Sequence, residues 1–544
     1  MLPNYTIEPE QLAKLNDLIP FSDQVSFIIP KPTKALPKAI LHRAVMSIEP
    51  ATVGMRQLRE ALKAEVCKGY LPELKLRDKL RAVVDDEPFF KELFTTEWGN
   101  LSQYEALVQD VKDLLNSISP TFCLSKWNEV TINLARSGNH SCCRTELEIS
   151  DLAEVIENPQ AIHNSKSKQA SREMMLTGVR SPECAYCWKQ EDTSKHVSHR
   201  VLLSISHLKD FYRVLESKLG ESYTPTQVEI YSSSTCQLKC FYCGPDYSSA
   251  WRQELVEDCS YKLRHGKMFS IKNLAPALTN QSPFLLAYEK VIKEWYPQLT
   301  TLRFTGGEPL LATQLWKMLD YAIENPSPQL TISINSNLCV GDKRIERLIR
   351  KLNSLDGKVK EIWVHASGEA VGAQMEYIRF GSNYQQWKSN IRKLLEQTPS
   401  SVKVTIMNTL NVLCYNSFTE LVNDILELRR EFGERLVLMS FKYLLSPSFS
   451  DIRILPNPLK TEFVAKLENL IEVNNSMNAY ATGSLTESEV YSLKRLIDHV
   501  KLPPNSVHEL EDLRMFFKEY DRRRGTSFKD TFPELAQEIE YDTH

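Results

Sequence analysis

One short stretch, Cys236–Cys243, limits what this chain can fold into more than any other. Its cysteines are Cys236, Cys240 and Cys243, and it follows the apolar alternating run Gln227–Tyr231, which predicts a β-strand. Three thiolates on one tight loop can ligate three irons of a cubane iron–sulfur cluster and leave the fourth iron open for chemistry. The alternative is structural zinc, which usually needs a second cysteine pair that is not found near this loop.

A second motif follows one strand–helix unit later. The apolar run Leu299–Thr305 predicts a strand that ends in Gly306–Pro309. Glycines carry no side chain, so backbone carbonyls here can approach a ligand closely. The carboxylate of Glu308, at the end of a strand, suits a ligand ammonium group. The alternative is an ordinary turn closed by Pro309.

In this order, the three-cysteine loop and the Gly306–Pro309 run resemble the radical S-adenosylmethionine (radical SAM) family. The resemblance implies that S-adenosylmethionine chelates the open iron and is reductively cleaved to a 5'-deoxyadenosyl radical, which the protein positions against a substrate hydrogen. It also implies a partial (β/α)6 barrel and a reductant such as flavodoxin or ferredoxin. The implied cluster ligands and catalytic residues are Cys236, Cys240 and Cys243, and the motif residues at the cofactor are Gly306, Gly307, Glu308 and Pro309.

Composition narrows the class of protein. A length of 544 residues predicts two to four domains. A net charge of −3 with 25% charged residues gives no electrostatic reason to expect nucleic acid or an anionic membrane as partner. We find no signal-peptide pattern and no apolar stretch long enough to span a membrane, so we expect a cytoplasmic protein. Twelve cysteines then indicate metal or redox use rather than disulfides.

The chain divides into four expected parts. These are a helical N-terminal extension (1–118), an auxiliary cysteine element (119–205), the barrel (206–445) and a C-terminal helical region that caps the barrel's open side (446–544). Six strand-like runs alternate with amphipathic segments in the third part, which predicts an α/β fold with a parallel sheet and helices outside. The strand-like runs are Gln227–Tyr231, Leu299–Thr305, Leu330–Asn335, Lys360–Ala366, Val402–Asn408 and Arg435–Phe441.

The second part holds another cysteine set in two separated half-sites. The first half has Cys123 and, after Gly138, the neighbours Cys142 and Cys143; the second half is a Cys-x-x-Cys pair. Half-sites that meet in space can enclose a metal with four thiolates, and thiolates suit either an iron–sulfur cluster or zinc.

This pattern, with Glu191, Ser198 and Arg200 beyond it, resembles the SPASM/twitch extension of radical SAM enzymes, which implies an auxiliary [4Fe–4S] cluster. In that family the element usually follows the core, whereas here it precedes it. The implied ligands are Cys123, Cys143, Cys184 and Cys187. Cys143 fits the spacing from Gly138 better, although Cys142 is adjacent and the choice between them stays open.

Polar residues at further strand ends complete the candidate site. Ser336 and Asn337 close the third strand, and their short side chains suit a ribose. Tyr377–Gly381 resembles the family's Tyr-x-Arg-x-Gly run, which implies that Arg379 holds the methionine carboxylate. The alternative for each is a cap or turn residue.

The motifs favour an enzyme that removes a hydrogen from an unreactive carbon. The resemblance implies a peptide or protein substrate for many members with an auxiliary cluster, and a small molecule such as a sugar, alcohol or nucleotide for others. A hypothesis of another class is a non-catalytic interaction protein that binds zinc or iron–sulfur clusters. The Gly306–Pro309 run has no use in such a protein.

Overall fold

The computed structural model describes residues 111–541, except 194–197, 218–219, 266–281, 439–441, 477–482 and positions 505 and 507. The expected N-terminal extension therefore lies outside the described residues, apart from 111–118, which are helical. The chain forms two compact units. Of the described residues, the first includes those of 111–129, 140–147 and 163–224, and the second includes those of 130–139, 148–162 and 225–541. No helix among the described residues has the length and apolar character needed to cross a bilayer.

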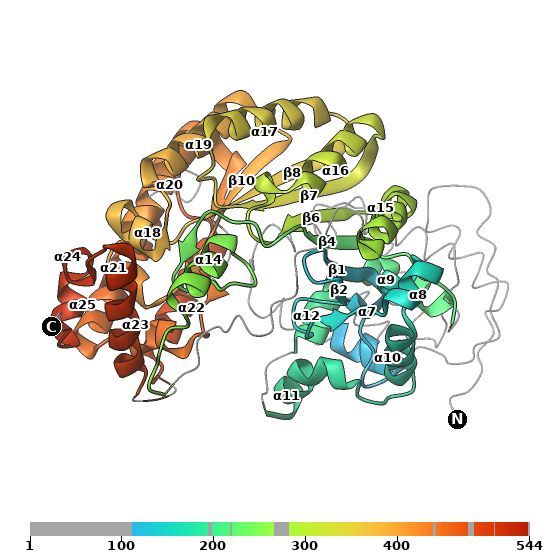
Figure 1. Cartoon of the computed structure of the whole chain (residues 1–544), viewed down its shortest axis with the longest axis horizontal. Helices are drawn as coiled ribbons and strands as arrows, with labels where there is room; N and C mark the ends of the chain where they lie inside the picture. The colour runs from blue at the N-terminus through green and yellow to red at the C-terminus, as the bar shows by residue number, and fades with distance from the viewer. Residues whose placement is uncertain are drawn as a thin grey trace, which may run out of the picture. The chain divides into compact units, whose positions relative to one another are not determined.

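A nine-stranded sheet in the order β12-β10-β8-β7-β6-β4-β1-β2-β3 forms the centre of the second unit (Figure 1). Neighbours from β4 to β12 pair in parallel. Parallel strands are covered on both faces, which explains their near-continuous apolar runs. The parallel strands are β4 (Gln227–Tyr231), β6 (Thr301–Thr305), β7 (Ser327–Ser336), β8 (Val359–Ser367), β10 (Val402–Met407) and β12 (Leu436–Leu438).

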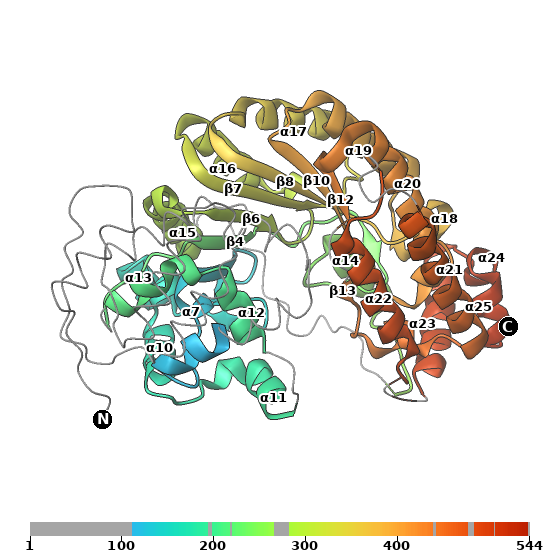
Figure 2. The ribbon, with the colours of Figure 1, turned by 180° about the vertical axis from the view of Figure 1, so that it is seen from behind.

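Helices follow these strands in alternation, which confirms the predicted α/β class. In α17 (Asp342–Leu355) the buried residues Ile345, Leu348, Ile349 and Leu352 recur three and four positions apart, so one stripe of the helix faces the sheet. The helices α16 (Thr313–Glu324), α17, α19 (Tyr384–Gln397) and α20 (Phe418–Phe432) lie along one side of the sheet in both views (Figures 1 and 2). The helix α15 (Pro283–Trp295) precedes β6.

The strands β1 (Glu129–Asn133), β2 (Gly138–His140) and β3 (Glu148–Ile149) extend the same sheet beyond β4. Their residues fall in the expected auxiliary element, so part of that element contributes strands to the central sheet. The reason is local: Val130 and Ile132 bury apolar side chains, and the N–H of Leu134 donates to the carbonyl of Tyr231 at 3.0 Å.

The C-terminal region is helical, with α21 (Asn457–Ser476), α22 (Glu487–Lys501), α23 (Glu509–Arg524), α24 (Phe528–Thr531) and α25 (Pro533–Glu538). Aromatic side chains of α23 pack against the three-cysteine loop: the Phe517 ring lies 5.3 Å from the Phe241 ring, centroid to centroid. Tyr520 stacks at 5.0 Å against Tyr377, which precedes β9 (Arg379–Phe380). The cysteine loop is therefore part of the main hydrophobic core and not a surface appendage.

Candidate functional site

The three-cysteine loop starts at the C-terminal end of β4, and its backbone is held on two sides. Within it, β5 (Lys239–Cys240) pairs antiparallel with β9, so that Cys240 stands opposite Arg379. On the other side is α14 (Ser249–Asp258), whose N-cap Ser248 donates to the carbonyl of Leu238 at 2.6 Å. Trp251 in the same helix donates its indole N–H to the carbonyl of Cys240 at 2.8 Å. A loop fixed in this way can present its thiols in one geometry.

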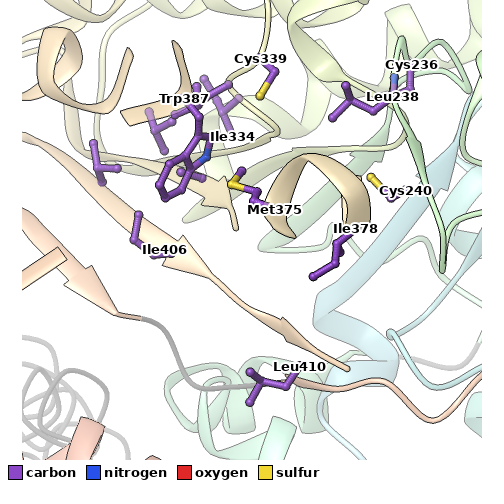
Figure 3. Packing of buried hydrophobic residues seen from close by; sticks show 14 of the residues in the cluster. Cys236, Leu238, Cys240, Ile334, Cys339, Met375, Ile378, Trp387, Ile406 and Leu410 are labelled. Atoms are coloured by element: carbon purple, nitrogen blue, oxygen red, sulfur yellow. The ribbon is translucent and has the colours of Figure 1, made fainter. Parts of the chain in front are cut away.

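Cys236 and Cys240 are buried in the main hydrophobic core, to which Leu238 and Ile378 also belong (Figure 3), and Cys243 is partly buried against this core. Burial raises the pKa of Cys236 to about 12 and raises those of Cys240 and Cys243 as well. The nearby thiols add to the rise for Cys236 and Cys243. Without a bound cation these groups therefore stay protonated. A metal that supplies positive charge would convert them to thiolate ligands, so the donor set fits an iron–sulfur cluster.

The glycines of the second motif let two loops meet. Gly306 has a φ of +116°, and a Cβ on Gly307 would lie 2.4 Å from the carbonyl oxygen of Thr235. The N–H of Gly307 donates to Ser233 and that of Glu308 to Thr235, both at 2.8 Å. We expected the glycines to admit a ligand; in the structure they admit the backbone that leads into the cysteine loop.

Glu308 joins the ends of β6 and β7. Its carboxylate is 1% exposed and accepts hydrogen bonds from Ser336 Oγ at 2.8 Å, from the N–H of Asn337 at 2.7 Å and from the N–H of Leu310 at 3.0 Å. Burial raises the pKa of Glu308, and these hydrogen bonds oppose the rise. A carboxylate has about four acceptor positions, so one remains for a further donor such as an ammonium group.

Asn337 connects this carboxylate to the cysteines. Its side-chain amide lies 3.7 Å from Cys236 Sγ and accepts from Gln237 at 3.2 Å, while its N–H donates to Glu308. One hydrogen-bonded group thus connects three places: the loop after β4, the turn after β6 and the end of β7. Ser336 and Asn337, predicted as ribose contacts, are here also the partners of Glu308.

Arg379 lies in the same region, where its guanidinium binds other side chains of the protein. Its guanidinium is 7% exposed and pairs with Glu369 at 3.1 Å, and it donates to Tyr242 Oη at 2.5 Å. Tyr242 in turn donates to Glu369 at 2.5 Å. The Nε of Arg379 is buried and has no hydrogen-bond partner among the described residues. That nitrogen is thus a buried donor of Arg379 that the described residues leave unused.

The second cysteine set converges in the first unit. One pocket is lined by Cys123, Cys142, Cys184 and Cys187 together with aromatic and basic side chains. Cys123 lies just before α7 (Ser125–Asn128), Cys184 ends the turn Pro182–Cys184, and Cys187 lies in α11 (Ala185–Thr193). Cys143 is exposed and does not line this pocket. The structure therefore brings together three of the four predicted ligands and places Cys142 where we expected Cys143.

The residues beyond the Cys-x-x-Cys pair hold this pocket together. Glu191 accepts from Ser198 at 2.6 Å and from Arg200 at 2.8 Å. Arg200, 2% exposed, also donates to the carbonyl of Phe122 at 2.8 Å, next to Cys123. This network joins the two half-sites. Burial raises the pKa of Cys142 to about 12 and that of Cys187 to about 11.

The sulfur spacing bears on which metal fits. Among the described residues, donor atoms within 4.8 Å of one another occur in one group of three, and that group contains no cysteine. A tetrahedral zinc ion about 2.3 Å from each thiolate would bring the sulfurs to about 3.8 Å from one another. Among the described thiols of either cysteine set, no three sulfur atoms lie within 4.8 Å of one another, so closing the set around a single zinc ion would require the side chains to move.

Comparison with known proteins adds no relative: no protein-family model matches this sequence, and no curated protein matches it significantly. Sequence reasoning missed Gln237 and left the choice between Cys142 and Cys143 open. Tyr242 and Glu369 carry a signal in the sequence, since Tyr242 lies between two cysteines and Glu369 follows the end of β8, but their contacts with Arg379 could not be predicted. The asparagines Asn408 and Asn411, just after β10, bond to protein: Asn408 donates to Gly368, and Asn411 caps a short helix.

Proposed function

We propose that this chain is a radical SAM enzyme whose sheet and helices form a partial (β/α)6 barrel. The observation that carries the proposal is the hydrogen-bonded group in which Cys236, Glu308 and Asn337 come together from three neighbouring strand ends. In parallel α/β folds, ligands bind at the C-terminal ends of the strands. In this chain, motif residues from distant parts of the sequence lie together at such strand ends.

The protein's part in the proposed reaction is binding, orientation and enclosure. Cys236, Cys240 and Cys243 would hold a [4Fe–4S] cluster with one open iron. Glu308 would accept from the ammonium of S-adenosylmethionine, and Arg379 Nε would donate to its carboxylate. When bound, the cluster and S-adenosylmethionine supply one-electron reductive cleavage to a 5'-deoxyadenosyl radical, which removes a substrate hydrogen. The burial of Cys236 and Cys240 in the hydrophobic core would limit the access of water to the site.

The pocket in the first unit would hold an auxiliary [4Fe–4S] cluster ligated by Cys123, Cys142, Cys184 and Cys187. With four protein thiolates, such a site is suited to carrying an electron. A reductant such as flavodoxin or ferredoxin would supply the electrons.

We propose a peptide or protein as the substrate, with a small molecule as the alternative. A gene for a short peptide beside the gene for this chain would favour the first.

Anaerobic purification tests the proposal most directly. Iron–sulfur protein should be brown, with broad absorbance near about 400 nm, and reduction with dithionite in the presence of S-adenosylmethionine should release 5'-deoxyadenosine. Replacing Cys236, Cys240 and Cys243 together with alanine should remove one of two clusters and abolish that product. Cys259→Ser, at an exposed cysteine outside both sets, is the control and should behave as the wild type.

A triple variant that still cleaves S-adenosylmethionine would overturn the assignment of the loop. Colourless protein with stoichiometric zinc would instead favour the interaction-protein hypothesis.

A further inference from the structure

One further group of metal-binding side chains contains no cysteine. His265, His508 and Glu511 each offer one donor atom, and these atoms all lie within 4.8 Å of one another. No other group of three or more potential ligands in the described part of the chain is this close. All three residues belong to the second unit.

The backbone around this group is fixed independently of the three side chains. His508 is the N-cap residue of α23, and Glu511, three residues later, lies on the same side of the first turn. Buried Asp512 accepts hydrogen bonds from the N–H groups of Arg264 and His265 at 2.8 and 3.0 Å. The segment that carries His265 is thereby anchored to the start of α23.

The side chains already converge. His265 Nε2 lies 2.8 Å from the Glu511 carboxylate, and the imidazole rings of His265 and His508 stack with centroids 4.2 Å apart. Arg264 also pairs with Glu511, but its side chain is 66% exposed. A divalent cation bound at the nitrogen edges of the two rings, beside the Glu511 carboxylate, would replace it, and the guanidinium would move into solvent at little cost.

The donor set indicates which metal would bind. Two imidazole nitrogens and one carboxylate oxygen form a zinc ligand set that leaves one tetrahedral position for water. The partial exposure of both histidines leaves room for that water. The group offers no thiolate, so it would not take the iron–sulfur clusters proposed for the cysteines.

We propose that His265, His508 and Glu511 form a zinc site that ties the end of the 261–265 segment to the start of α23. The site is independent of the radical SAM proposal, because it shares no ligand with either cysteine set. Zinc would stabilise the folded chain according to its free concentration relative to its dissociation constant.

Zinc K-edge X-ray absorption on the full-length protein tests this site. The protein is first loaded with its clusters, so that the thiols are occupied, and then given one equivalent of zinc chloride. We expect a shell of nitrogen and oxygen at about 2.0–2.1 Å and no sulfur. A sulfur shell at about 2.3 Å would place the zinc on the cysteines and overturn the proposal.

Substitutions identify the ligands in the same protein. His265→Gln and His508→Gln should each weaken zinc binding in calorimetry at least tenfold, because loss of outer-shell partners alone costs about 10–100-fold. His499→Gln is the control. His499 stacks on Tyr443 and is not part of the group, so the zinc affinity of this variant should equal that of the wild type. Equal affinity in all three variants and the wild type would overturn the proposal. If a variant folds poorly, the zinc K-edge X-ray absorption spectrum of the wild type still decides between the two kinds of ligand.

Discussion

At the scale of single residues, Glu308 shows how one buried carboxylate can organise a site. It accepts from two groups at the end of β7 and from one in its own turn, and one acceptor position remains. A role in holding the loops together and a role in binding a ligand are therefore both possible for the same side chain, and they can be separated by substitution.

Glu308→Gln should keep the shape and one acceptor oxygen but lose the negative charge. We expect affinity for S-adenosylmethionine to fall by about one to two decades, because a charged hydrogen bond contributes about 1.5–3 kcal/mol. Iron content should not change. Calorimetry on the cluster-loaded protein measures the affinity. Glu308→Ala should in addition lower stability, since it leaves three donors without their acceptor; unchanged affinity in the Gln variant would remove Glu308 from the ligand site.

His365, at the end of β8, predicts a pH dependence of stability. Burial lowers its pKa to about 3, with Arg303 adding to the effect, and Nδ1 lies 2.5 Å from Thr405 Oγ1. A folded-state pKa below the unfolded value of about 6.5 stabilises the fold above pH 6.5, and this contribution is lost as the pH falls toward 3.

We therefore expect His365→Gln to flatten the decline of stability between about pH 6.5 and pH 4. The difference from the wild type should amount to a few kcal/mol at most, on the order of 1.4 kcal/mol per pKa unit. Urea unfolding of metal-free protein at several pH values gives the comparison. Parallel pH profiles of the two proteins would show that His365 is not buried as a neutral group.

At the scale of elements, α23 supports the cysteine loop from the far end of the chain. Arg524, its last residue, has a fully buried side chain and donates to the carbonyl of Lys239 at 2.8 Å. It lies 3.8 Å from the Tyr520 ring centroid and also pairs with Glu254 in α14. We expected the C-terminal helices only to cap the barrel; one of them contacts the backbone next to Cys240.

Arg524→Met should loosen this loop, because the buried Glu254 carboxylate then loses one of its positively charged partners. Removing one partner of a buried ion pair costs about 3–5 kcal/mol. Hydrogen exchange should accelerate at the amides of 236–243. Arg522→Met, in the same helix with a side chain 60% exposed, is the matched control and should leave exchange unchanged. Equal protection in both variants would show that Arg524 does not hold the loop.

The sequence predicted these elements unevenly. Apolar runs located the parallel strands within a few residues, since buried strands of this kind need continuous hydrophobic side chains. The attachment of β1 beside β4 was not predictable, because periodicity shows that a strand exists but not which strand it pairs with. Contacts between distant residues, such as Arg524 with Lys239, leave no local pattern either.

At the scale of the whole molecule, the two cysteine sets belong to different compact units. Spacing along the chain predicted that both sets exist. It did not distinguish Cys142 from Cys143, since neighbouring residues differ in the direction of their side chains, and only the fold determines which one faces the pocket. The two sets should therefore be separable by substitution.

Cys142→Ala and Cys184→Ala should each lower the iron content by about one cubane and destabilise the first unit, because a metal that joins distant ligands also stabilises their fold. Cleavage of S-adenosylmethionine without substrate should survive. Cys143→Ala is the control and should keep both clusters. Iron analysis and Mössbauer spectra decide the outcome: a full two-cluster signal in Cys184→Ala would exclude this pocket, and zinc in place of iron would make it a structural site.

The contact between Arg524 and Lys239 also sets an order of events during synthesis. The two residues are 285 positions apart. At about 5–20 residues per second, a ribosome that has just made the cysteine loop needs roughly 15–60 s more before Arg524 exists. During that interval the loop lacks its support from α23. A cluster of the kind proposed above, if inserted during synthesis, would therefore enter a loop that lacks this hydrogen bond, whereas later insertion would meet the loop with the hydrogen bond in place.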